Sequence, residues 1–159
     1  RHFQDIPGQN PDPALLPIAN DPQGAPSCSL PYTPHLSISH CALGAVCALG
    51  RGGRRVGIDW EATAPREPGL EKMFARPGEP ISETDRDEDI TRLWAAKEAV
   101  SKLLGLGLNC PPLDLQIRPH LRLYGRALAR WEELGRPDIE LTLSDRPGSV
   151  FALAYTGEP

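Results

Sequence analysis

The chain of 159 residues lacks the features that mark several large classes of protein. Its apolar runs are too short to span a bilayer, and no charged stretch followed by an apolar one suggests a signal peptide. The formal net charge is -4 at pH 7, so no excess of basic residues favours a nucleic-acid partner. We therefore expect neither a membrane nor a nucleic acid among its partners.

Familiar catalytic signatures are missing as well. The sequence contains no G-x-S-x-G nucleophile motif, no cysteine and histidine at a known catalytic spacing, and no glycine-rich loop for a phosphate. None of the four cysteines belongs to a C-x-x-C pair. We interpret them as small buried apolar residues in a reducing cytoplasm, with a metal or disulfide role as the alternative. They are Cys28, Cys41, Cys47 and Cys110.

The chain does have enough apolar content, 40%, for one compact domain with a core. Eight of its 18 prolines lie in the first 35 residues, where they disfavour helices and central strands. We predict a proline-rich leader or wrapping segment over residues 1–34 and a single domain over residues 35–159. Because the first residue is Arg1 rather than Met, we expect a processed chain or a piece of a longer polypeptide.

The apolar pattern predicts an α+β fold, with an antiparallel sheet and helices packed on one face. Residues 35–50 indicate one or two strands, and Gly52 and Gly53 favour a hairpin to the next strand, over residues 55–59. One helical turn is expected near residues 70–75. The chain ends in a predicted hairpin whose strands, IELTLSD and SVFALAYT, are joined across residues 145–149.

Two amphipathic helices are predicted, over about residues 83–104 and 121–134. Acidic residues open the first helix, where they suit the positive end of the helix dipole, and Gly105 ends it. Its apolar positions at helical spacing are Leu93, Ala96, Val100, Leu103 and Leu104. The second helix is expected to bury Leu123, Ala127, Trp131 and Leu134, with Arg122, Arg126 and Arg130 on another face.

The first candidate site residues are two acids at the end of the strand VGIDWEA. Side chains at i and i+2 of a strand point the same way, so Asp59 and Glu61 share a face while Trp60 points to the other. Two carboxylates this close repel unless a cation lies between them, and oxygen ligands favour a hard ion such as Mg²⁺. The alternative is a solvated strand end with two surface acids.

The first predicted helix places Trp94, Glu98 and Lys102 four residues apart on one face. A Glu and a Lys at this spacing commonly form a surface pair, but a solvated face seldom carries a tryptophan. If this face covers the strand end, Glu98 becomes a third carboxylate for the cation and Lys102 can neutralise a phosphate. Ser39 and His40 lie on the predicted strand that precedes VGID. The histidine is either an ordinary structural residue or a donor to a phosphate.

Taken in order, four motifs resemble those of the 4′-phosphopantetheinyl transferases: SISH (37–40), VGIDWE (56–61), WAAKEAVSK (94–102) and GLGL (105–108). The closing hairpin is also similar, less specifically. The resemblance implies an α+β enzyme that moves the phosphopantetheine arm of coenzyme A onto a serine of an acyl or peptidyl carrier protein. It also implies Mg²⁺ on the pyrophosphate of the coenzyme.

The resemblance assigns roles to individual residues. Asp59, Glu61 and Glu98 would hold the metal, and the catalytic set would be Glu98, Lys102 and Asp59. Glu98 would act, directly or through water, as the base for the carrier serine, and Lys102 would contact phosphate and assist departure of 3′,5′-ADP. His40, with Ser39, would meet coenzyme phosphate. A metal clamp and a carboxylate that activates an alcohol suit this chemistry.

The chain departs from both common builds of the family, a homotrimer of small subunits and a longer chain that fuses two similar halves. Its motif order follows the longer build, but few residues precede SISH, and GAP (24–26) stands where that build often has G-K-P. Arg51, Arg54 and Arg55 are candidates for the basic residues expected near the adenine. We predict either a homo-oligomer that completes the site or a domain of a larger synthase, in which the predicted arginine face could meet an acidic carrier helix.

Three hypotheses remain at this point. The first is an active cytoplasmic transferase, the second a degenerate member kept as a structural or coenzyme-A-binding module, and the third an unrelated α+β interaction domain. Protection of the fold against heat by coenzyme A with Mg²⁺ separates the third from the others. If the three carboxylates converge, Asp59→Asn should abolish transfer and leave the metal-free fold intact or slightly more stable.

Overall fold

The computed structural model describes residues 18–21, 24–28, 35–79 and 81–157. The two α-helices within these residues are α1 (Arg86–Leu104) and α2 (Gly125–Glu133), and short 3₁₀ turns occur at Leu70–Met73, Gly107–Asn109 and Pro112–Asp114. The strands in chain order are β1 (Ile18–Asn20), β2 (Pro26–Cys28), β3 (His35–Cys41), β4 (Gly44–Gly50), β5 (Val56–Ala62), β6 (Leu115–Gln116), β7 (Arg122–Leu123), β8 (Ile139–Arg146) and β9 (Ser149–Thr156).

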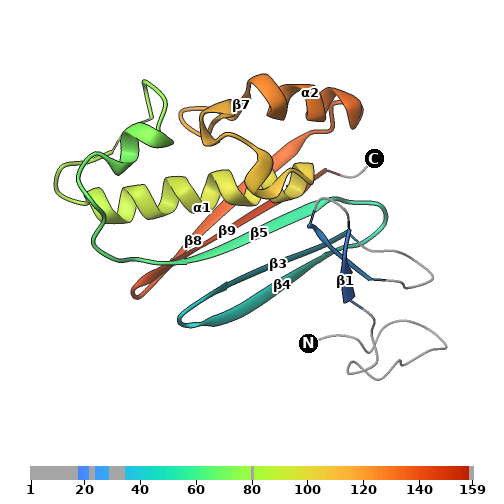
Figure 1. The fold of residues 1–159 in the computed structure, drawn as a ribbon, viewed down its shortest axis with the longest axis horizontal. Coiled ribbons are helices and arrows are strands. Elements are labelled where there is room, and N and C mark those ends of the chain that lie inside the picture. Colours follow the sequence, from blue (N-terminus) through green and yellow to red (C-terminus); the bar gives the residue numbers. More distant parts are fainter. Residues whose placement is uncertain (1–17, 22–23, 29–34, 80, 158–159) are drawn as a thin grey trace.

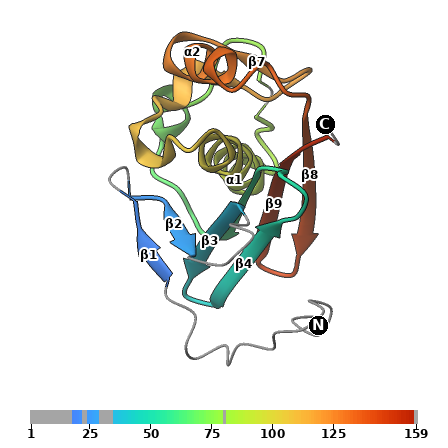
Figure 2. The same cartoon turned by 90° about the vertical axis from the view of Figure 1, so that its right-hand side faces the viewer.

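The central layer is an antiparallel sheet in the order β5-β9-β8, and α1 lies across one of its faces (Figure 1). Figure 2 looks nearly along α1, which lies between α2 above it and the separate β3–β4 hairpin below it. The core forms where α1 meets the sheet, and the predicted apolar positions of that helix are all buried there. The predicted α+β architecture, with antiparallel strands and helices on one face, is confirmed.

A glycine lets α1 approach β5 closely. A side chain at Gly57 would collide with the backbone of Ala99 and of Leu103 in the helix. Small residues continue this contact on β9, where Ala152 and Ala154 are fully buried. The close approach sets the C-terminal half of α1 over the first half of β5, where Lys102 reaches the Ile58 carbonyl and Asp59.

The predicted hairpin from residue 50 into β5 is wrong. A turn does exist there, since the Arg54 amide donates to the Arg51 carbonyl at 3.1 Å. However, β4 pairs with β3, and β5 pairs with β9, with Asp59 opposite Ala152. Side chains of β3, rather than its backbone, reach the free edge of β5, so no backbone ladder joins the two strands.

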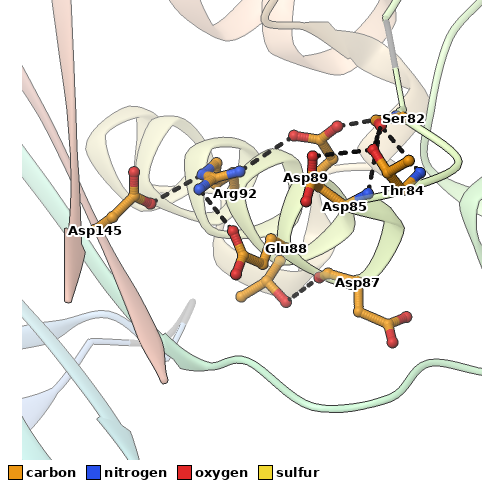
Figure 3. Close-up of polar contacts among 9 residues, drawn as sticks. Ser82, Thr84, Asp85, Asp87, Glu88, Asp89, Arg92 and Asp145 are labelled. Carbon is orange, nitrogen blue, oxygen red and sulfur yellow. Dashed lines mark hydrogen bonds and ion pairs between the residues drawn. The ribbon is translucent and has the colours of Figure 1, made fainter. Parts of the chain in front are cut away.

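The N-terminus of α1 begins at Arg86, three residues later than predicted, because the preceding residues form a turn held by the Ser82 hydroxyl. The acidic first turn is confirmed. Figure 3 shows Arg92 reaching from the helix toward Asp145 of β8. The distance from Arg92 Nε to the Asp145 carboxylate is 2.9 Å, and Arg92 also pairs with Glu88 and Asp89. This network fastens the start of the helix to the sheet.

The second helix is shorter than predicted. It starts at Gly125 because the Asp114 carboxylate accepts a hydrogen bond from the Arg126 amide at 2.7 Å, and a side chain at Gly125 would collide with that carboxylate. Residues 122–123 form β7 instead, so Arg122 does not belong to a helical arginine face. Ala127 is fully buried, and the remaining apolar positions pack against the core; they are Leu123, Trp131 and Leu134.

The terminal hairpin is confirmed as β8 and β9, and the helical turn expected near residues 70–75 occurs at Leu70–Met73. All four cysteines are free. Cys28 and Cys110 are buried as predicted, Cys41 is partly buried, and the prediction is wrong for Cys47, which is exposed on the outer strand β4. Within the described part of the chain, no helix has the length and apolarity needed to cross a membrane.

The segment predicted as a proline-rich leader falls mostly outside the described residues. Its described portions form the β1–β2 hairpin, with Asn20 opposite Pro26. This hairpin lies beside β3 in Figure 2 and contributes to the wall of the cleft described next.

Candidate active site

A cleft of about 1220 Å³ opens between the β1–β2 hairpin, β3, the C-terminal half of α1 and the loop that follows it. This is above the roughly 300–1,000 Å³ common for small-molecule sites. All the site residues predicted from the sequence line it, namely Ser39, His40, Asp59, Glu61, Glu98 and Lys102, and so does Trp94. Residues from three separate motifs are thus gathered in one place.

Asp59 lies at the bottom of the cleft with an exposed fraction of only 3%. One of its oxygens, Oδ1, accepts hydrogen bonds from Lys102 Nζ at 2.6 Å and from Ser39 Oγ at 2.8 Å. The other oxygen, Oδ2, is buried without a hydrogen-bond partner in the described structure. A buried carboxylate oxygen without a donor is costly, so this atom is suited to a further ligand.

The other two acids lie within electrostatic reach of Asp59. Burial raises the pKa of Glu61, and the negative charge of Asp59 raises it further. The positive charge of Arg66, whose guanidinium lies 3.7 Å from the Glu61 carboxylate, acts in the opposite direction. Burial also raises the pKa of Glu98, where Lys102 acts against the shift and the two neighbouring acids add to it. Glu61 and Glu98, whose pKa values are raised in part by the charge of Asp59, form with it a region that favours a cation.

These residues fit a hard divalent cation by their chemistry, since they supply carboxylate oxygens and one of them is an orphaned buried atom. In the arrangement seen here Lys102 occupies one side of Asp59. Among residues 18–21, 24–28, 35–79 and 81–157, no three potential ligand side chains already converge as a metal site. A cation would therefore require side-chain rotations within the cleft.

The S-x-S-H motif forms a ladder that sequence reasoning missed. Ser39 Oγ, Ser37 Oγ and His35 Nδ1 accept hydrogen bonds from the β5 amides of Trp60 (3.1 Å), Ile58 (3.0 Å) and Val56 (3.2 Å). The signal available in the sequence was the alternation of polar side chains at 35, 37 and 39, which share one face of a strand.

The histidines of this region differ in environment. Burial, and then the charge of Arg55, lower the pKa of His35 to about 4, so it is neutral and able to accept the Val56 amide. His40 is exposed and borders the cleft. Of the two, only His40 was predicted as a site residue.

Arginines line the far end of the cleft, at the C-terminus of α1. Arg55 Nε donates to the Leu103 carbonyl at 2.8 Å, and Arg130 Nε of α2 donates to the Leu104 carbonyl at 3.1 Å. Burial and the neighbouring Arg130 lower the pKa of Arg55. Arg54 also borders the cleft. The sequence suggested Arg51, Arg54 and Arg55 for this region. Arg51 is not among the described residues that line the cleft, whereas the fold brings in Arg130 from a distant helix.

Comparison with known proteins agrees with the motif pattern. The family model described as the 4'-phosphopantetheinyl transferase superfamily matches residues 55–149, which is more than half of the chain. No curated protein matches.

Solved structures with a similar fold include the ACPS–CoA complex of Chronobacterium ammoniagenes, at 22% identity and a TM-score of 0.47, covering 65% of this chain and 96% of that one. A holo-ACP-synthase from Plasmodium yoelii matches at 21% identity and a TM-score of 0.46, covering 65% and 96%. An acyl carrier protein synthase of Mycobacterium tuberculosis matches at 25% identity and a TM-score of 0.44, covering 66% and 97%.

Proposed function

This chain belongs to the 4′-phosphopantetheinyl transferase superfamily, and from this we propose that it transfers the 4′-phosphopantetheine moiety of coenzyme A to a serine of an acyl or peptidyl carrier protein. This is the activity of a holo-acyl-carrier-protein synthase. The observation that supports it best is the buried Asp59, whose Oδ2 lacks a hydrogen-bond partner among the described residues while Glu61, Glu98 and Lys102 line the same cleft.

In the proposed reaction, the hydroxyl oxygen of the carrier serine bonds to the pantetheine-side phosphorus of coenzyme A. The bond from that phosphorus to the bridging pyrophosphate oxygen breaks, and 3′,5′-ADP leaves with the electron pair. Glu98 takes the serine proton, directly or through water; its raised pKa brings it closer to that of an effective general base near neutral pH. Lys102 neutralises charge on the departing phosphate.

We assign the metal to Asp59, Glu61 and Glu98. When bound, Mg²⁺ would supply positive charge to the pyrophosphate oxygens. The present partners of these acids, Lys102 at 2.6 Å from Asp59 and Arg66 at 3.7 Å from Glu61, keep the acids paired in its absence. With a cation bound to Asp59 instead, Lys102 would be free to turn from Asp59 toward phosphate.

For the coenzyme we propose contacts to phosphate from His40 and Lys102, which border the open cleft. Ser39 was predicted beside them and lines the same wall, but its hydroxyl is turned toward Asp59. Arg54, Arg55 and Arg130 are suited to further phosphate at the other end of the cleft. Anionic groups favour such a cluster because each arginine is otherwise repelled by its neighbours.

The carrier protein is the proposed partner, and a second copy of the chain, or the remainder of a larger synthase, is proposed to complete the site. Leu43 and Leu49, at the turn and on the outer strand of the β3–β4 hairpin, are 57% and 43% exposed, which suits a covering partner. Full activity of a monomer in solution would count against a second copy. The four free cysteines support a reducing cytoplasm as the compartment.

A non-catalytic module that binds coenzyme A is the second candidate. It is favoured by the sequence GAP (24–26), which lines the cleft without the lysine that the longer family build often has there. Such a module would gain heat stability from coenzyme A but would modify no carrier.

The deciding experiment is intact-protein mass spectrometry of a panel of apo carrier proteins incubated with the chain, coenzyme A and Mg²⁺. We expect a phosphopantetheine mass gain on at least one carrier, and none with the Asp59→Asn/Glu98→Gln variant. A folded chain that modifies no carrier, yet melts at a higher temperature with coenzyme A, would support the binding module instead.

A further inference from the structure

Ser39 uses its hydroxyl twice inside the protein. The residue is 6% exposed, and its hydroxyl oxygen accepts a hydrogen bond from the Trp60 amide at 3.1 Å. The same hydroxyl donates its proton to Asp59 Oδ1 at 2.8 Å. It therefore ties together the backbone of β5 and the carboxylate that projects from the neighbouring residue of that strand.

Ser37 is a built-in comparison. It lies two residues earlier on the same face of β3, is 3% exposed, and accepts a hydrogen bond from the Ile58 amide at 3.0 Å. Thus Ser37 and Ser39 make the same bond to β5. They differ in that Ser39 also donates to a carboxylate of the candidate site.

The two oxygens of the Asp59 carboxylate differ in their hydrogen bonding. Oδ1 accepts hydrogen bonds from Lys102 at 2.6 Å and from Ser39 at 2.8 Å, whereas Oδ2 is buried with no partner in the part of the chain that the structure describes. Lys102 sits on a flexible side chain that is 24% exposed, so it can leave. Ser39 is held by its second bond to β5 and cannot follow, so it is the fixed contact that sets the rotation of the carboxylate.

We propose that Ser39 is a positioning residue that holds the Asp59 carboxylate by Oδ1, so that Oδ2 remains directed to a divalent cation. This inference rests on the proposed function, because it concerns the cation of that site. It replaces a direct contact between Ser39 and coenzyme phosphate with an indirect role, through the orientation of a ligand. Partners that orient a metal ligand typically contribute 10- to 100-fold to metal affinity or activity.

The test measures binding of Mn²⁺ to the full chain by calorimetry, with transfer kinetics as a second readout. We expect Ser39→Ala to weaken Mn²⁺ binding by about 10-fold or more, and Ser37→Ala to change it by less than about twofold. Both variants lose an acceptor for one β5 amide, and Ser39→Ala also loses the hydrogen bond to Asp59, so urea unfolding should show a loss of stability in both variants and a larger one in Ser39→Ala. Ser39→Thr, which keeps the hydroxyl, should restore Mn²⁺ binding.

The kinetic readout separates positioning from direct contact with the coenzyme. If Ser39 positions Asp59, kcat falls in Ser39→Ala while KM for coenzyme A stays close to that of the parent chain. A raised KM for coenzyme A with unchanged Mn²⁺ affinity would overturn the inference in favour of a phosphate contact. Equal Mn²⁺ affinity of the two alanine variants would overturn it in favour of simple strand packing.

If the proposed transferase function is wrong, the experiments give a different pattern of results from the one expected if the positioning role is wrong. A parent chain that binds Mn²⁺ but modifies no carrier contradicts the transferase proposal, while the calorimetric comparison of Ser39 with Ser37 still decides the positioning role. A folded parent chain that binds no Mn²⁺ overturns the positioning role directly. If Ser39→Ala does not fold, Ser39→Cys keeps the volume with a much weaker donor, and unchanged Mn²⁺ affinity there would refute the inference.

Discussion

The three lysines of the chain occupy graded environments, which makes them a test of what buried charge contributes to this fold. Lys72 is exposed, the Lys102 side chain is 24% exposed, and the Lys97 side chain is 2% exposed. Lys97 lies in the middle of α1, next to Glu98, yet points to the side of the helix away from the cleft. Its Nζ donates to the Glu79 carboxylate at 2.8 Å and to the carbonyls of Phe74, Pro112 and Leu115.

We predict that Lys97→Met lowers the free energy of unfolding by about 3–5 kcal/mol, because it leaves the Glu79 carboxylate buried with no ammonium and three carbonyls without their donor. Methionine keeps most of the apolar stem, so the loss reflects charge and hydrogen bonding rather than a cavity. Lys102→Met should lose about 1–3 kcal/mol, since its partners are fewer and water reaches the group. Lys72→Met should stay within about 0.5 kcal/mol.

Urea unfolding followed by far-ultraviolet circular dichroism measures all three variants under one condition. Adding Glu79→Gln to Lys97→Met should recover part of the loss, because the second change removes the uncompensated charge. A Lys97→Met variant that is no less stable than Lys72→Met would refute the reasoning, and so would a double variant that is no more stable than Lys97→Met alone.

Three further predictions concern the cleft and its support. Burial lowers the pKa of His35 to about 4, so the unfolded state binds the extra proton between about pH 6.5 and 4. Stability should therefore fall as the pH drops through that window. The slope of the urea midpoint against pH should flatten in His35→Asn, and an unchanged slope would contradict the prediction. Because burial raises the pKa of Glu98, its negative charge opposes folding at neutral pH. Glu98→Gln should therefore raise the melting temperature of the metal-free chain while lowering the rate of transfer at least 100-fold. An unchanged melting temperature by calorimetry would contradict this. Gly57→Ala should cost about 1–3 kcal/mol or more in urea, because a methyl group cannot fit against the backbone of α1; a neutral result would mean that the helix can move away.

The sequence predicted those parts of the fold that local periodicity determines. Helix α1, with its acidic start and its end at Gly105, and the closing β8–β9 hairpin follow from patterns within a single segment. The pairing of β5 did not, because its neighbour β9 lies about 90 residues later and the nearby turn at Gly52 and Gly53 suggested a closer partner. Local turn signals cannot reveal that a strand edge is taken by side chains.

The sequence indicated several residues that line the cleft, but not their contacts with one another. Spacing placed Glu98 and Lys102 on one face of α1, and the resemblance joined them to Asp59 and Glu61. Long-range contacts such as Arg130 and the ladder from β3 depend on how separate elements pack. A pattern of residue types contains no direct information about such packing.

The acid whose ionised form destabilises the metal-free fold is also not the one that the sequence suggested. Convergence of carboxylates alone led to the expectation that Asp59→Asn would leave the metal-free fold intact or slightly more stable. In the structure Asp59 is the acid that has its own cation, at 2.6 Å, and its own hydroxyl donor, at 2.8 Å. Glu98 has neither contact at that range among the described residues, and burial dominates its pKa. The stabilising change is therefore expected at Glu98, and Asp59→Asn should weaken the fold by removing the carboxylate that Lys102 and Ser39 share.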